Sequence, residues 1–216
     1  KKRFRVGGIT YYYRLGKLQA CPSKRITLKK KIRKDENGNI IPDRTPKQRK
    51  NNTKFTFARY MFAFIRKRFG DLPVWKIAAA QRGMTDDNLI QSTNYKYLDE
   101  KGKILDMEGF QVSLGPLALP LNLRATRNGT LVSITWDDPR DEPSAAPTDR
   151  MMVGIFYADY RDTFTLEKET GTTRRDGKCE IILRDDDGEV CIHPFFARAD
   201  NTAFSEDKAI TLPDTE

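Results

Sequence analysis

The feature that most constrains this fold is a series of short apolar runs from residue 95 to the end of the chain. The runs are GFQVSL, LPLNLRAT, LVSITW, MMVGIFYA, KCEIIL, EVCIHPFFAR and AITL. Turn signals separate them, among them Asn128-Gly129, Asp176-Gly177 and the Pro-rich stretch DDPRDEPSAAPTD. Several short strands with turn signals every 8–12 residues or so are typical of an antiparallel β-sandwich. We therefore expect residues 95–216 to form a sandwich domain.

One part of this series has a more specific pattern. The stretch PLNLRATRNGTLVSITWDDP is similar in rhythm to the opening of a fibronectin type III domain. In that opening a Pro-Leu strand precedes a strand that ends in a core Trp, which would be Trp136 here. The expected sandwich is thus of the immunoglobulin or fibronectin type III kind.

The segment CEIILRDDDGEVC suggests a hairpin with its turn at Asp185–Gly188. In that register Ile182 would face Cys191, and Cys179 would lie opposite Pro194. A Cys179–Cys191 disulfide is then not expected. With a sparse, odd count of three cysteines, we expect free thiols.

A long helix is predicted to begin at Thr45, because a hydroxyl cap is followed by Pro46 and, three residues on, by Gln48. Gly70 marks its end. Its apolar residues at 3–4-residue spacing indicate one buried stripe. The stripe comprises Phe55, Ala58, Phe62, Ile65 and Phe69. Two shorter helices are expected over 72–81 and, with Thr85 as N-cap, over 86–93.

Strand patterns also occur before this helix. Ile9–Arg14 and the run after the Leu-Gly-Lys turn predict one hairpin, and a Lys-rich ribbon turning at Asn37-Gly38 predicts a second, which Pro42 stops. We assign residues 1–94 to a hairpin-plus-helical N-terminal region. The whole chain is thus expected to be α+β.

Charge divides the chain unevenly. Residues 1–60 hold 19 Lys/Arg and 3 Asp/Glu, a net charge of +16, whereas residues 61–216 hold 20 and 27, a net charge of −7. Such asymmetry points to contact of the first part with a polyanion or an acidic protein surface. The candidate contact residues are Tyr11, Tyr12, Tyr13, Arg14, Lys29, Lys30, Lys31, Arg33 and Lys34.

Two kinds of partner fit these residues. Dense cations can neutralise phosphates and exposed tyrosines can stack on bases, as in a nucleic-acid-binding protein. A ribbon with Lys29, Lys31 and Arg33 on one face could instead dock on an acidic protein, including the net-negative sandwich of a second copy. We expect a non-enzymatic binding or assembly protein making protein contacts, with nucleic-acid binding as the alternative.

The residues that could carry catalysis are sparse. His193 is the only histidine, so no His pair can hold zinc. Cys191 shares its strand face, yet no orienting motif accompanies them, and a core Cys near a histidine is the favoured interpretation. The acidic clusters occupy predicted turns, where Asp is favoured locally, and no nucleotide-binding glycine pattern is present. No catalytic residue, metal or cofactor is expected.

Longer motifs suggest a family. They include GGITYYYRLGKL, RTPKQRKNNTKF, NYKYLDEKGKILDMEGFQVSLGPLALPLNLRATRNGTLVSITWDDP, DRMMVGIFY, GTTRRDGKCEIIL and FFARADNTAFS. Over nearly its whole length the chain resembles the uncharacterised bacterial family called domain of unknown function 6266. The most specific pieces are Arg44–Gln48, Ser113–Gly115 and Trp136–Asp138. The Lys-rich hairpin before Arg44 departs from the family pattern. The resemblance implies an architecture and no activity.

No apolar run reaches the roughly 18 residues that span a bilayer, and no signal-peptide pattern is visible in these residues. These features favour a cytoplasmic location.

Overall fold

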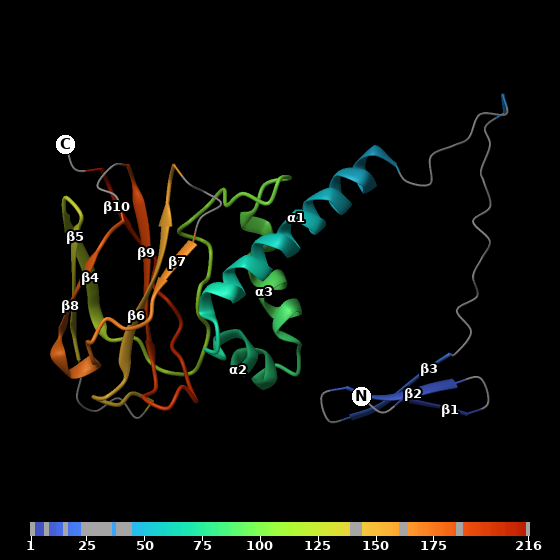
Figure 1. The fold of residues 1–216 in the computed structure, drawn as a ribbon, viewed down its shortest axis with the longest axis horizontal. Helices are drawn as coiled ribbons and strands as arrows, with labels where there is room; N and C mark the ends of the chain where they lie inside the picture. Colours follow the sequence, from blue (N-terminus) through green and yellow to red (C-terminus); the bar gives the residue numbers. More distant parts are fainter. Residues whose placement is uncertain are drawn as a thin grey trace. The chain divides into compact units, whose positions relative to one another are not determined.

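The computed structural model describes residues 3–6, 9–14, 17–22, 36–37, 45–138, 144–159, 164–184 and 188–214. The chain divides into two compact units, residues 1–49 and residues 50–216. The first unit holds an antiparallel sheet of order β1-β2-β3, formed by Arg3–Val6, Ile9–Arg14 and Lys17–Pro22 (Figure 1). The Lys-rich ribbon expected around Asn37-Gly38 lies outside the described residues, except for 36–37.

The chain is α+β, as expected: three α-helices accompany two further antiparallel sheets in the described part of residues 45–214. Helix α1 spans Pro46–Phe69 and begins where the sequence predicts. The Thr45 hydroxyl accepts the Gln48 amide at 3.2 Å, and the Gln48 side chain accepts the Thr45 amide at 2.9 Å. This reciprocal cap satisfies two amides that a helix start leaves open. The helix ends at Gly70, whose positive φ of 60° suits glycine.

Helices α2 and α3 follow closely and cover Val74–Gln81 and Asp86–Asn94. The Thr85 hydroxyl accepts the Asn88 amide at 3.3 Å, which confirms the expected N-cap of α3. A short 3-10 helix, η1, continues over Tyr95–Tyr97.

The remaining strands form two sheets. One has the order β4-β5-β8 and the other β10-β9-β6-β7. Their bounds are β4 Leu121–Asn128, β5 Leu131–Asp137, β6 Arg150–Tyr157, β7 Phe164–Glu167, β8 Lys178–Ile182, β9 Val190–Ala197 and β10 Ile210–Leu212. A second 3-10 helix, η2, covers Arg174–Asp176.

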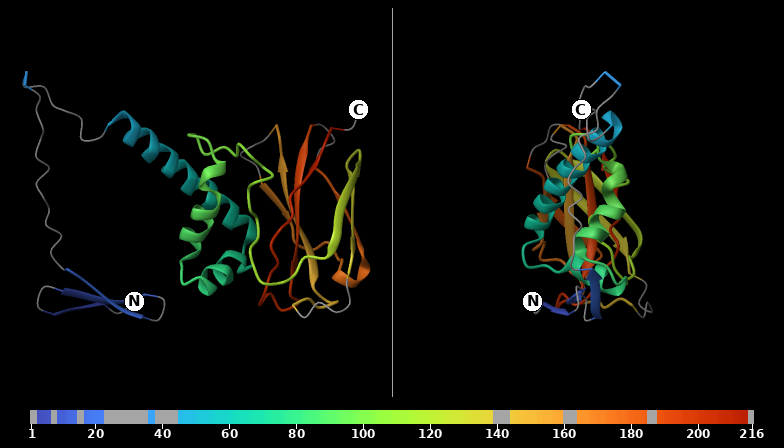
Figure 2. Two further views of the ribbon diagram at one scale, coloured as in Figure 1. Left: turned by 180° about the vertical axis from the view of Figure 1, so that it is seen from behind. Right: turned by 90° about the vertical axis from the view of Figure 1, so that its right-hand side faces the viewer.

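Two apolar cores explain the layers. One lies between the two sheets and includes Trp136, Val153 and Phe196. The other lies between the four-stranded sheet and the helices and includes Phe62, Ile65 and Phe195. Figures 1 and 2 show the four-stranded sheet in the middle, with α1–α3 on one side and the three-stranded sheet on the other. All eight residues of β9 are buried, as in strands that are covered on both faces.

The predicted hairpin between Cys179 and Cys191 is wrong. Strand β8 pairs with β5, and β9 pairs with β6 and β10, so the two segments belong to different sheets. The chain therefore passes from one sheet to the other between β8 and β9. Cys179 and Cys191 are buried free thiols, as expected.

Two positions near the expected family motifs have clear structural roles. Trp136 on β5 is buried, and its Nε1 donates to the Arg174 carbonyl at 2.7 Å. At Gly115 a Cβ atom would lie 2.0 Å from the carbonyl oxygen of Phe204, so only glycine fits this crossing. The boundary expected between residues 94 and 95 stays a prediction.

Candidate functional site

The residues predicted to contact a partner lie in the first unit. Tyr11, Tyr12, Tyr13 and Arg14 lie in sequence on β2, where Tyr11 pairs with Phe4 on β1 and with Ala20 on β3. The Tyr11 side chain is half-buried. The other predicted contacts fall outside the described residues. They are Lys29, Lys30, Lys31, Arg33 and Lys34.

Helix α1 is the largest described element in the positively charged region. It carries eight basic residues and no acidic one. The eight are Lys47, Arg49, Lys50, Lys54, Arg59, Arg66, Lys67 and Arg68. Those near its N-terminus add to the positive end of the helix dipole, an arrangement that destabilises the helix and attracts anions.

The first half of α1 is open to solvent. No residue before Ala58 is buried, and all from Pro46 to Phe57 are exposed except Lys54, which is half-buried. Lys50 forms an ion pair with Glu100, and the Lys54 ammonium lies 4.7 Å from the centre of the Tyr95 ring. Lys50 and Lys54 are themselves like charges four residues apart, which repel along a helix.

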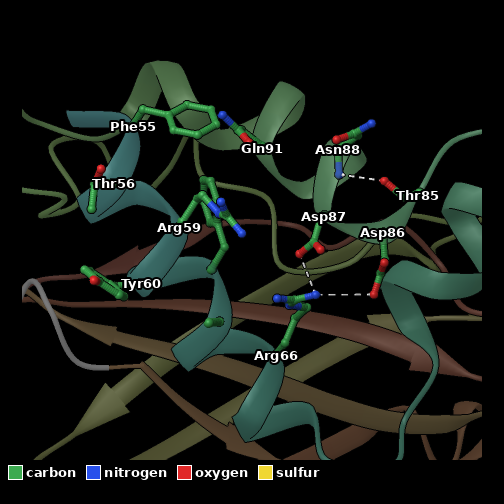
Figure 3. A pocket seen from close by; sticks show the side chains of 12 residues that line it. Phe55, Thr56, Arg59, Tyr60, Arg66, Thr85, Asp86, Asp87, Asn88 and Gln91 are labelled. Carbon is green, nitrogen blue, oxygen red and sulfur yellow. Dashed lines mark hydrogen bonds and ion pairs between the residues drawn. The ribbon is translucent and has the colours of Figure 1, made fainter. Parts of the chain in front are cut away.

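A groove of about 870 Å³ lies between α1 and α3 (Figure 3). Its size falls within the range of ligand-binding clefts. The lining residues from α1 are Phe55, Thr56, Arg59, Tyr60, Phe62, Ala63 and Arg66. Those from α3 and its cap are Thr85, Asp86, Asp87, Asn88 and Gln91.

The charges in the groove are only partly paired. The Arg66 guanidinium lies 2.6 Å from Asp87 and 3.5 Å from Asp86, so it compensates both carboxylates of the α3 wall. In Figure 3 Arg59 extends from α1 into the same space. Within the described residues, Arg59 has no ion-pair partner. The groove thus offers one cation to an incoming group.

Large aromatic side chains border the groove. Tyr60 is 68% exposed and Phe55 is 43% exposed. The sequence places Phe55 in the buried stripe of the helix, and this expectation is wrong. The buried face starts only at Ala58, where α1 reaches the body of the second unit. The periodicity of apolar residues identifies the stripe, but it does not identify the residue at which the helix begins to pack against the rest of the second unit.

The only constellation resembling a catalytic centre in the described residues surrounds His193. Its Nδ1 lies 2.6 Å from Asp207 Oδ2, and its Nε2 lies 3.4 Å from Cys191 Sγ. Asp207 is oriented through its other oxygen, which accepts the amides of Val112 and Ser113. Sequence reasoning paired Cys191 with His193 but missed Asp207, because only the folded chain brings residue 207 beside β9.

Burial defines what this cluster can do. The side chains of His193 and Asp207 are 0% and 3% exposed, and Cys191 is also 0% exposed. Burial disfavours charge on His193, but the hydrogen bonds with Asp207 and Cys191 outweigh it and raise the pKa of His193 to about 9. A second cavity, of about 420 Å³, is lined by Asp207 but not by Cys191 or His193. The thiol is therefore closed to a substrate in this conformation.

A second buried charge cluster joins the sheets at one end of the core. Arg174 is 1% exposed, and its guanidinium approaches Asp149 and Asp138 at 3.7 Å each. It also donates to the Ala118 carbonyl and stacks over Phe196 at 4.5 Å. The two carboxylates compensate the charge of this buried cation, which is a structural role.

In the described ranges, no group of three or more His, Cys, Asp or Glu side chains is placed to hold a metal ion. None of the described helices is long and apolar enough to cross a membrane. No protein-family profile matches the chain, and neither does any curated protein.

Proposed function

We propose that this chain is a non-enzymatic binding or assembly protein that makes protein contacts through its positively charged N-terminal region and its β-sandwich. One observation carries this proposal: the first half of α1 is exposed, and the whole helix holds eight basic residues and no acidic one. A helix that is polar and exposed around its circumference gains little from its own protein. An acidic partner surface would relieve the repulsion between its cations.

The scaffold of this binding protein is, in our proposal, a sandwich of the fibronectin type III kind. Strand order supports this assignment, because β4-β5-β8 faces β10-β9-β6-β7 across a common core. Trp136 on β5 is buried, as the sequence resemblance to a fibronectin type III opening leads us to expect, and this supports the assignment as well. Sandwiches of this architecture serve many unrelated binding functions, so the assignment leaves the partner open. We also propose that the chain belongs to the family called domain of unknown function 6266, which its sequence resembles.

The absence of catalysis is also a proposal. The support is the complete burial of Cys191 and His193, which leaves the nucleophile and base without access to a substrate. A hydrolase that uses its acidic residues would need convergent carboxylates in a cleft. In the groove between α1 and α3 the two carboxylates are instead paired with Arg66.

The proposal is tested by affinity capture with the immobilised full chain and two variants of equal charge. Lys47→Glu/Arg49→Glu changes the exposed start of α1, and Lys101→Glu/Lys103→Glu makes the same change on an exposed loop. We expect protein partners to be retained by the wild type and the loop variant and lost from the helix variant. Sedimentation velocity on the same proteins measures self-association. A monomer whose captured proteins do not depend on the α1 charges would contradict the proposal.

Nucleic-acid binding is the second candidate, and one observation favours it. Helix α1 interleaves its cations with exposed Phe55, Phe57 and Tyr60, a combination that suits phosphates and stacked bases. Single- and double-stranded oligonucleotides titrated at about 50 and 200 mM salt test this alternative. A steep loss of affinity with salt would favour it, and no binding near 50 mM would remove it.

A further inference from the structure

The groove between α1 and α3 has two chemically different walls. The α1 wall presents the Arg59 cation and two exposed aromatic rings, Phe55 and Tyr60. The α3 wall presents the Asn88 and Gln91 amides beside Asp87. An occupant must therefore satisfy a cation and an apolar surface on one side and polar, partly acidic groups on the other.

The α1 wall favours an occupant with an acidic and an apolar side chain. Arg59 can bind a carboxylate of the occupant through two parallel hydrogen bonds. Arg66 is already paired with Asp86 and Asp87, so Arg59 is the cation that remains for this contact. Tyrosine and other large aromatic side chains supply much of the energy at protein interfaces when a partner covers them.

The α3 wall distinguishes a peptide from a nucleic acid. Asn88 and Gln91 are three residues apart on the helix, so they share a face, and each amide can donate and accept hydrogen bonds. A peptide backbone has both donors and acceptors, and it can also donate an amide to Asp87. A phosphodiester backbone has only acceptors, so it cannot donate a hydrogen bond to the Asp87 carboxylate or to the amide oxygens of Asn88 and Gln91.

We propose that this groove binds an extended acidic segment of a partner protein, with a carboxylate on Arg59 and an apolar side chain against Phe55. The peptide backbone lies along Asn88 and Gln91. This inference deepens the proposed function and rests on it, because it names one site for the protein contact. It differs in place from the exposed start of α1, so different variants test the two.

A peptide selection tests the inference with the full-length chain. Random dodecapeptides displayed on phage are selected on the immobilised protein, and the enriched peptides are synthesised with a fluorophore. Fluorescence anisotropy then gives their Kd for the wild type, Arg59→Glu, Phe55→Ser and Lys67→Glu. Lys67→Glu is the matched control, since Lys67 is an exposed cation of the same helix outside the groove lining. Circular dichroism confirms that the variants keep their helices.

The inference predicts enriched peptides with Asp or Glu next to a large apolar residue. Their Kd should rise at least about 10-fold in Arg59→Glu and in Phe55→Ser, and less than about 2-fold in Lys67→Glu. No enrichment, or peptides without acidic residues, would overturn it. Equal losses of affinity in Arg59→Glu and Lys67→Glu would rule out the groove as the peptide site. They would leave the general charge contact of the proposed function intact.

A competition experiment tests whether a nucleic acid occupies the groove instead of a peptide. Single-stranded oligothymidylate is added to the peptide complex and titrated alone against the wild type and Arg59→Glu. We expect it to displace the peptide only weakly. Tighter binding than any selected peptide, lost in Arg59→Glu, would overturn the inference in favour of nucleic acid in the groove.

Discussion

The buried pair of His193 and Asp207 should make stability depend on pH in a defined direction. The folded-state pKa of His193 is raised to about 9 from 6.5. A raised pKa means that the folded protein binds the proton more tightly than the unfolded chain does. The stabilisation is therefore fully present below pH 6.5 and is lost as the pH rises through 9. Applying about 1.36 kcal/mol per unit to the difference gives roughly 3 kcal/mol.

The test is Asp207→Asn, which removes the charge and leaves an oxygen that can still accept the amides of Val112 and Ser113. Urea unfolding is measured for both proteins between about pH 6.5 and 9. We expect the free energy of unfolding of the wild type to exceed that of the variant by about 3 kcal/mol at the lower pH, and most of this difference to be lost at the higher pH.

Asp200→Asn is the matched control, because this exposed carboxylate has a pKa below its usual value and does not titrate between these pH values. Its stability difference from the wild type should stay constant over the range. Parallel pH profiles for the wild type and Asp207→Asn would refute the reasoning, since they would mean that His193 does not hold a proton in the folded state.

Two further predictions concern the core. Trp136→Phe removes the indole donor from the Arg174 carbonyl and leaves a small void, so the free energy of unfolding should fall by about 2–3 kcal/mol in a urea titration. An unchanged midpoint would contradict the role given to this side chain. Gly115→Ala should cost about 3 kcal/mol or more, because its Cβ would meet the Phe204 backbone. Gly129→Ala should cost only about 1 kcal/mol by the same assay, since it meets no atoms and only its positive φ is strained.

Features encoded by neighbouring residues were accessible from sequence. The Thr45 and Gln48 cap, the stop at Gly70 and the Thr85 cap are all confirmed, because each depends on contacts within four residues. Trp136 was also expected in the core and lies there.

Features that depend on distant pairing were not accessible. The turn after β8 has the composition of a hairpin, but sequence does not reveal that β8 completes one sheet and β9 the other. Asp207 is similar, since its contact with His193 requires the loop before β10 to return to β9. The groove requires the relative placement of α1 and α3, and no local pattern of Phe55 or Arg59 reports it.

The four-stranded sheet that is covered on both faces limits how this chain can be divided. Many sandwich domains have outer sheet faces that tolerate water, so they can be moved between proteins as modules. Here Met152, Phe156 and Phe195 lie under the helical layer. The two sheets separated from α1–α3 would expose this apolar face and would aggregate. The helices cover this face of the four-stranded sheet, so any transplant or truncation of the two sheets has to carry residues 45–94 with it.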